Sequence, residues 1–116
     1  MTPAAIEFEQ AGCTVVCTLS NPEVSHLEMQ EAVEECANLM RNDGARVFIL
    51  DLSAVEFLAS ACIGVLVQFM QDLEHIRGRL ALVGCQDPVK FLFQVTRLDQ
   101  VFHLYDDVDE AQAALA

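Results

Sequence analysis

The chain has 116 residues, of which 53% are apolar, which is enough for the core of one domain and too much for a disordered chain. Six basic and eighteen acidic residues give a formal net charge of −12. Nucleic acids and anionic membrane surfaces are bound through Lys and Arg, so the charge argues against both and favours a partner with a basic patch. The alternative is that the acidic surface only keeps the domain soluble.

The sequence carries no recognisable membrane or export signal. No apolar run reaches the roughly 18 residues that a membrane helix needs. The N-terminal stretch MTPAAIEFEQ lacks the basic start and apolar segment of a secretory signal. We therefore expect a cytoplasmic protein without membrane insertion. The five cysteines are odd in number and form no C-x-x-C pair, so we expect buried free thiols and no disulfide framework, metal site or cofactor.

In chain order, the first predicted elements are two strands and a helix. IEFEQAGCTVVCTL predicts two short strands around Ala11-Gly12, and Asn21-Pro22 is typical of a turn. Ser25 precedes Glu28 by three residues, which is the capping-box spacing at a helix start. Gly44 is expected to end this helix. The residues at helical spacing that should face the core are Met29, Val33, Cys36, Ala37 and Met40.

The middle of the chain pairs a buried strand with a long helix. RVFILDL is nearly all apolar from Val47 to Leu50, which is typical of a strand buried on both faces. A loop over 52–59 leads to a helix from Ser60 to Ile76, which Arg77-Gly78 ends. This helix is apolar nearly all round from Ala61 to Met70. It is therefore either fully buried or partly covered by a partner, and we expect burial.

Strands and helices continue to alternate up to the end of the chain. RLALVG predicts a buried strand, Asp87 and Pro88 predict the cap and first residue of a helix, and QVFHLY predicts a last short strand. Asp106 or Asp107 should cap a final helix, VDEAQAALA. The order β-β-α-β-α-β-α-β-α predicts one α/β domain over residues 1–116. Its mixed, mostly parallel sheet has four to five strands, with about four helices packed on it.

Ser60 stands where a loop beyond a buried strand meets the next helix, which is where such sheets bind ligands or partners. One interpretation is a plain N-cap that contributes ~1 kcal/mol. A second is a phosphate acceptor, because a helix N-terminus favours an anion, and a phosphate there would block a docked partner. A third, a nucleophile, needs a base, and nothing places His26, His75 or His103 beside Ser60. We therefore do not expect an enzyme.

The stretch VFILDLSAVEFLASACIGVLVQF resembles the core motif of STAS domains, the anti-sigma factor antagonists. That motif ends a buried strand with D-L-S-x-V-x-F and opens a helix with D-S-S-G-L-G-V-L. The matching residues are Asp51, Leu52, Ser53, Val55, Phe57, Ser60, Gly64, Val65 and Leu66, with Ile63 in place of a Leu. Downstream, GRLALVG and LDQVFHLYDDVDEAQAAL also resemble the last strands and helix of the family, so the resemblance covers nearly the whole chain.

This resemblance implies an anti-sigma factor antagonist with the STAS fold, which regulates sigma-dependent transcription. Such a protein binds an ATP-binding anti-sigma factor serine kinase in a one-to-one complex, so that the sigma factor is released. The kinase then phosphorylates the first serine of the motif, which corresponds to Ser60, and the complex dissociates. A separate phosphatase resets the switch.

Three positions next to the serine depart from the motif. Ala59 replaces its Asp, Ala61 its second Ser, and Cys62 its first Gly. At a helix N-terminus Cys62 is either a reactive thiol or a buried small residue, and we expect burial. These departures favour an alternative function, that of a STAS scaffold or small-ligand-binding module without a phosphorylation cycle. The residues expected to bind the partner are Ser25, Leu58, Ala59, Ser60, Ala61, Cys62 and Ile63, with the exposed side of the following helix.

Overall fold

The computed structural model describes residues 6–115, which form a five-stranded sheet with strand order β1-β2-β4-β6-β7. β1 is antiparallel to β2, and the other neighbouring pairs are parallel. This confirms the predicted mixed, mostly parallel sheet. Residues 1–5 of the stretch examined for an export signal, and Ala116 of the expected final helix, lie outside the described residues. The strands are β1 (Ile6–Ala11), β2 (Thr14–Leu19), β4 (Val47–Asp51), β6 (Arg79–Val83) and β7 (His103–Tyr105).

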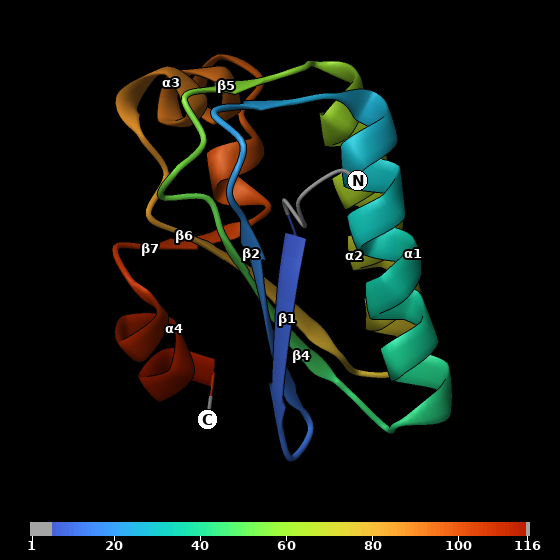
Figure 1. The fold of residues 1–116 in the computed structure, drawn as a ribbon. Coiled ribbons are helices and arrows are strands. Elements are labelled where there is room, and N and C mark those ends of the chain that lie inside the picture. Colours follow the sequence, from blue (N-terminus) through green and yellow to red (C-terminus); the bar gives the residue numbers. More distant parts are fainter. Residues whose placement is uncertain (1–5, 116) are drawn as a thin grey trace.

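The described part of the chain has four α-helices, which agrees with the predicted number. Figure 1 shows α1 (His26–Asn42) and α2 (Ala61–His75) side by side on one face, and α4 (Val108–Leu115) on the other. α3 (Asp87–Val95) lies at one end of the sheet and is followed by the short 3₁₀ helix η1 (Leu98–Gln100). No helix within residues 6–115 combines the length and the apolar character that crossing a membrane requires.

The alternation of side chains along β4 builds a core on each face of the sheet. Phe48 and Leu50 belong to the larger core on the side of α1 and α2, and the Phe48 ring meets that of Phe69 edge-on with centroids 5.1 Å apart. Ile49 points the other way, into a smaller core under α4. Successive residues of a strand face opposite sides, so a strand with helices on both faces is apolar throughout. This confirms the predicted burial of β4.

Several predicted helix ends are confirmed by their hydrogen bonds. The Glu28 backbone N–H donates to Ser25 Oγ at 3.2 Å, which makes Ser25 the N-cap of α1. The Glu28 carboxylate, however, accepts from the Asn21 side-chain amide at 2.7 Å, so only one arm of the capping box is formed. Gly44 follows the helix with a φ of +72°, which glycine adopts without strain. At α4, the Glu110 N–H donates to Asp107 Oδ1 at 2.8 Å.

Two predictions are corrected by the structure, and one pair of strands was missed. Asp87 is the first residue of α3, and Gln86 holds the cap position, so the cap was placed one residue late. The strand expected from QVFHLY begins only at His103, because its first residue belongs to η1 and the next two form a turn. A further two-stranded sheet, β3 (Glu23–Val24) with β5 (Phe57–Leu58), was not predicted.

Candidate functional site

The small sheet of β3 and β5 brings the starts of α1 and α2 together. β3 pairs in parallel with β5, Glu23 opposite Phe57 and Val24 opposite Leu58. The Ala59 N–H donates to the Val24 carbonyl at 3.2 Å, which extends the pairing by one bond. α1 begins after β3 and α2 begins after β5, so their N-termini lie at the same end of the molecule (Figure 1). The loop expected over 52–59 is therefore partly a strand, and it is held in place by β3.

Ser60 occupies the N-cap position of α2, but its side chain makes no capping hydrogen bond. Its backbone is already helical, with φ −59° and ψ −30°. A capping side chain needs an extended backbone to reach the N–H groups of the first turn, and Ser25 has one, with φ −81° and ψ 165°. The interpretation of Ser60 as a plain N-cap is therefore wrong. The exposed Ser60 hydroxyl is left accessible to a partner or to modification.

Residues of the matched motif shape the loop that leads to Ser60. The Ser53 N–H donates to Asp51 Oδ1 at 3.0 Å, and the Gln86 side-chain amide donates to the Ser53 carbonyl at 2.8 Å. Gly84 packs against this loop with a φ of +69°, and a Cβ on it would lie 2.8 Å from Ser53 Cβ. These contacts fix the start of the loop at Ser53, and the bond from the Ala59 N–H to the Val24 carbonyl fixes its end beside Ser60.

The predicted partner-binding residues divide by exposure. Ser25, Ser60 and Ala61 are exposed, and Ala59 and Ile63 are half-buried. Leu58 and Cys62 are buried in the core. The exposed and half-buried residues do lie together at one end of the molecule, around the starts of α1 and α2.

The Cys62 thiol is not exposed to solvent, and it links α2 to the small sheet by a hydrogen bond. Its Sγ donates to the Val24 carbonyl at 3.6 Å, and its side chain is fully buried. Burial raises the pKa of the Cys62 thiol, against the lowering that a backbone hydrogen bond from Ala59 exerts. A thiol with a raised pKa is protonated at neutral pH and is a poor nucleophile. The structure therefore supports the expected burial and not the reactive alternative.

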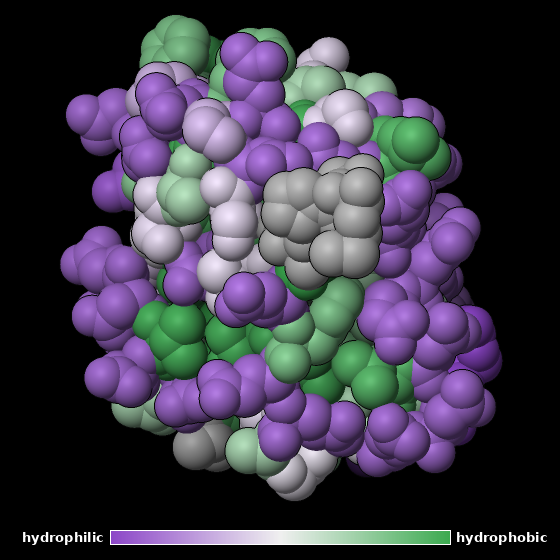
Figure 2. Space-filling model, viewed as in Figure 1, coloured by the Kyte–Doolittle hydropathy of each residue, from purple (hydrophilic) through white to green (hydrophobic). Residues whose placement is uncertain are grey.

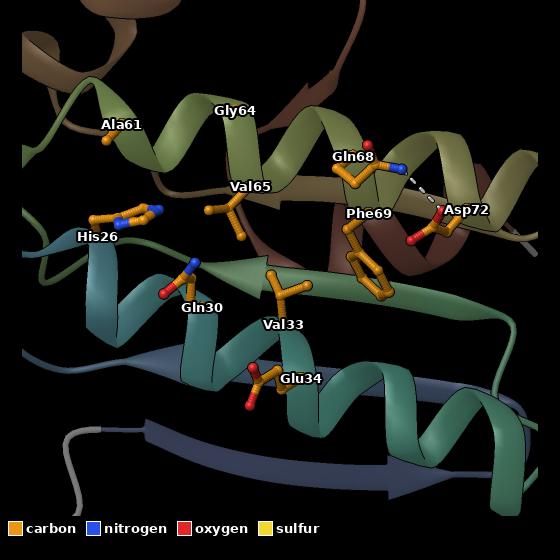
Figure 3. Close-up of a pocket in the computed structure, with 10 residues that line it drawn as sticks. All are labelled: His26, Gln30, Val33, Glu34, Ala61, Gly64, Val65, Gln68, Phe69 and Asp72. Atoms are coloured by element: carbon orange, nitrogen blue, oxygen red, sulfur yellow. Dashed lines mark hydrogen bonds between the residues drawn. The ribbon is translucent and has the colours of Figure 1, made fainter.

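A groove of about 420 Å³ runs between α1 and α2 (Figure 3). Val33, Val65 and Phe69 supply its apolar residues, and His26 lies near Ala61 at one end. Because the groove leaves Gly64 exposed, the expected full burial of α2 is wrong. Among the described residues, no hydrogen bond joins His26 to Ser60. The polar residues around the groove are His26, Gln30, Glu34, Gln68 and Asp72.

A second hollow, of about 370 Å³, lies on the other side of Ser60, between β5 and α3. Figure 2 shows apolar residues reaching the surface at the upper edge of the molecule, where α3 and β5 lie in Figure 1, while hydrophilic residues cover most of that face. Sequence reasoning did not assign α3 to the site, because its apolar residues are equally compatible with a core. The lining residues are Phe57, Leu58, Ser60, Pro88, Phe91, Leu92 and Val95.

Comparison with known proteins agrees with the fold. The model of the STAS domain matches residues 5–111. A Thermotoga neapolitana protein named as an anti-sigma factor antagonist is 31% identical over 91 residues, which cover 78% of this chain and 77% of that protein. That name describes an antagonist rather than an enzyme, in agreement with the expectation from the sequence.

Two structures of the anti-sigma factor antagonist SpoIIAA share the fold. The unphosphorylated form superposes with a TM-score of 0.81 at 22% identity and covers 94% of this chain and 93% of its own. The phosphorylated Bacillus form gives a TM-score of 0.75 at 20% identity and covers 97% and 100%. From the domain match and the Thermotoga relative, the chain belongs to the STAS domain family.

Proposed function

We propose that this protein is an anti-sigma factor antagonist, which binds an ATP-binding anti-sigma serine kinase while Ser60 is unmodified and releases it once Ser60 is phosphorylated. The observation that carries this is the exposed Ser60 hydroxyl, which makes no capping bond at the start of α2. The name of the Thermotoga relative supports the role. The fold shared with SpoIIAA, of which phosphorylated and unphosphorylated structures exist, supports the switch.

The position of Ser60 favours a phosphate in the free protein. The N-terminus of a helix has a positive dipole potential, and α2 is 15 residues long. A phosphate would bring about −1.5 to −2 charges, which the solvent around an exposed residue can hydrate. In a complex the same charges would have to be desolvated against the partner. Phosphorylation therefore costs little in the free protein and opposes binding.

The surface offered to the kinase comprises the exposed Ser25, Ser60 and Ala61 and continues along α2 to Gly64. The formal net charge of −12 would steer a basic patch of the kinase towards it. Ala59 replaces the Asp of the motif and thereby removes one negative charge from beside the phosphate acceptor. A phosphatase would complete the cycle by returning Ser60 to its hydroxyl form.

A STAS scaffold or ligand-binding module without a phosphorylation cycle is the second candidate. The groove between α1 and α2, about 420 Å³ with apolar residues and polar neighbours, has the size of a small-molecule site. Ala59 and Ala61 also depart from the motif beside the acceptor. This candidate would be favoured if the protein purified from its native cells were unmodified and carried a bound small molecule or another STAS protein.

The test combines phosphorylation and binding with purified ATP-binding anti-sigma kinases of the source organism. Intact-mass analysis after incubation with kinase and ATP should show one added phosphate, lost in Ser60→Ala and kept in Ser53→Ala. Ser53 is the matched control, because it is an exposed serine of the same loop. Ser60→Asp should weaken kinase binding by at least about tenfold. A phosphate retained in Ser60→Ala, or wild-type affinity of Ser60→Asp, contradicts the proposal.

A further inference from the structure

The exposed apolar side chains of α3 and β5 gather beside Ser60. Phe57, Phe91 and Val95 are 59%, 64% and 58% exposed, and all three line the hollow between β5 and α3. Phe91 and Val95 are four residues apart and so share one face of α3, while its buried residues, Val89 and Phe93, face the core. Apolar side chains scattered singly on a surface need no explanation, whereas a cluster around a cavity is typical of an interaction site.

The lining of this hollow is suited to an apolar group. Leu58, Pro88 and Leu92 complete its walls, and Ser60 is the only one of the described lining residues with a polar side chain. The hydroxyl that would accept the phosphate therefore lies at the margin of an otherwise apolar cavity of about 370 Å³.

Three acidic residues are neighbours, along the chain or across the small sheet, of residues that line the hollow. Glu23 is the cross-strand partner of Phe57, Glu56 precedes Phe57, and Asp87 opens α3 one turn before Phe91. All three acids are exposed. None of the described residues that line the hollow is basic, and Lys90, which precedes Phe91 on α3, lines a separate hollow with Cys85 and Asp99. Charge complementarity therefore selects a partner segment in which an apolar side chain is accompanied by Lys or Arg.

We propose that this hollow is an anchor pocket, which receives an apolar side chain of the anti-sigma kinase flanked by basic residues that face Glu23, Glu56 and Asp87. This rests on the proposed function and extends the binding surface to α3. Because Ser60 borders the pocket, a phosphate on it places charge where the anchor must enter. Seating the anchor would then desolvate the phosphate, so phosphorylation and anchoring exclude each other.

The test compares two exposed valines in calorimetric titrations of the full chain with the purified kinase. Val95→Asp places a charge in the pocket and should weaken binding at least about tenfold, as loss of an anchor contact does. Val101→Asp is the matched control, because Val101 is 44% exposed but borders a separate hollow with Met70, Arg79 and His103. The affinity of Val101→Asp for the kinase should be within about twofold of the wild-type affinity. Circular dichroism melting checks that both variants fold, and Phe91→Ala gives a second, uncharged test.

The coupling between pocket and switch is tested by combining variants. If Ser60→Asp already excludes the anchor, adding Val95→Asp should lower the affinity much less than it does in the wild-type background. Full additivity would overturn the mutual exclusion.

The outcomes separate this inference from the proposed function. Wild-type affinity of Val95→Asp together with lost binding of Ser60→Asp overturns the anchor pocket and leaves the switch standing. Failure of the wild-type chain to bind any of the kinases overturns both. A small apolar molecule that native mass spectrometry finds on the wild-type protein, but not on Val95→Asp, assigns the pocket to a ligand and also overturns the anchor.

Discussion

At the scale of single residues, two serines in similar places have different roles because their backbones differ. Ser25 and Ser60 each lie between a two-residue strand and a helix. Ser25 has an extended backbone and caps α1, whereas Ser60 has a helical backbone and makes no capping hydrogen bond. One serine therefore stabilises the fold, and the other is available for function.

Replacing each serine by alanine should separate these roles. Ser25→Ala removes the bond to the Glu28 N–H and should lower the free energy of unfolding by about 1 kcal/mol. Ser60→Ala removes no capping bond and should change it by less than about 0.5 kcal/mol. Equilibrium denaturation in urea measures both. An equal loss in the two variants would show that Ser60 caps α2 in solution.

At the scale of elements, α2 presents one stripe to the core and another to the groove. Cys62, Leu66, Phe69 and Leu73 are buried, whereas Gly64 is exposed. A Cβ on Gly64 would meet no atom of residues 6–115 within 4 Å. A glycine inside a helix costs about 1 kcal/mol relative to alanine. No contact within the described part of the chain explains this cost, whereas close approach of a partner backbone would.

Gly64→Ala should therefore change stability and binding in opposite directions. The free energy of unfolding should rise by about 0.5–1 kcal/mol, because the helix gains a better helix former without a clash. Affinity for the kinase should fall, because the new methyl group would stand between α2 and the partner. Thermal unfolding and calorimetric titration on the same preparations measure the two effects.

Gly78→Ala is the control for this pair of effects. Its Cβ would lie 2.7 Å from Leu73 Cδ2 and 2.8 Å from the Arg46 carbonyl oxygen, so it should destabilise the fold. Unchanged affinity of Gly64→Ala would exclude this stretch of α2 from the kinase interface.

The elements that could be predicted are those with a local pattern. The apolar run of β4 and the serine before α1 carry their own signals, and the buried strand and the Ser25 cap are both confirmed. β3 and β5 are too short to show an alternation, and they exist only because segments more than thirty residues apart pair with each other. The bond from the Ala59 N–H to the Val24 carbonyl extends this pairing to the residue before Ser60, and spacing along the chain gives no signal of it. Phe91 and Val95 are apolar like Phe93, and only packing decides which of them face outwards.

At the scale of the whole molecule, an acidic surface encloses a core that contains neutral thiols. The expectation of mostly buried cysteines is confirmed for Cys17, Cys36, Cys62 and Cys85, whereas Cys13 is exposed. A hydrogen bond with the Cys17 thiol, together with burial, raises the pKa of Cys36. Burial likewise raises the pKa of Cys62, and that of Cys85 to about 11. The free energy of unfolding therefore depends on whether the thiols of Cys36, Cys62 and Cys85 are protonated.

This linkage predicts that stability falls in alkaline solution. In the unfolded chain the thiols lose their protons near their usual pKa of 9.0, whereas Cys85 in the folded protein holds its proton up to about 11. A raised folded-state pKa gives stabilisation that is fully present below the unfolded pKa and is lost as pH rises through the folded one. The urea midpoint should therefore decrease from about pH 9 to pH 11.

Two cysteine variants isolate the buried thiol from the other groups that titrate in this range. Cys85→Ala should lower the midpoint at neutral pH, because it removes buried volume, but should make its decrease above pH 9 shallower. Cys13→Ala, at the exposed cysteine, should leave the decrease as it is in the wild type. A decrease that is equally steep in Cys85→Ala and wild type would show that the alkaline loss arises from groups other than Cys85. Phosphorylation of Ser60 should leave the difference between the two variants unchanged, because Ser60 is exposed and does not belong to the core that holds Cys85.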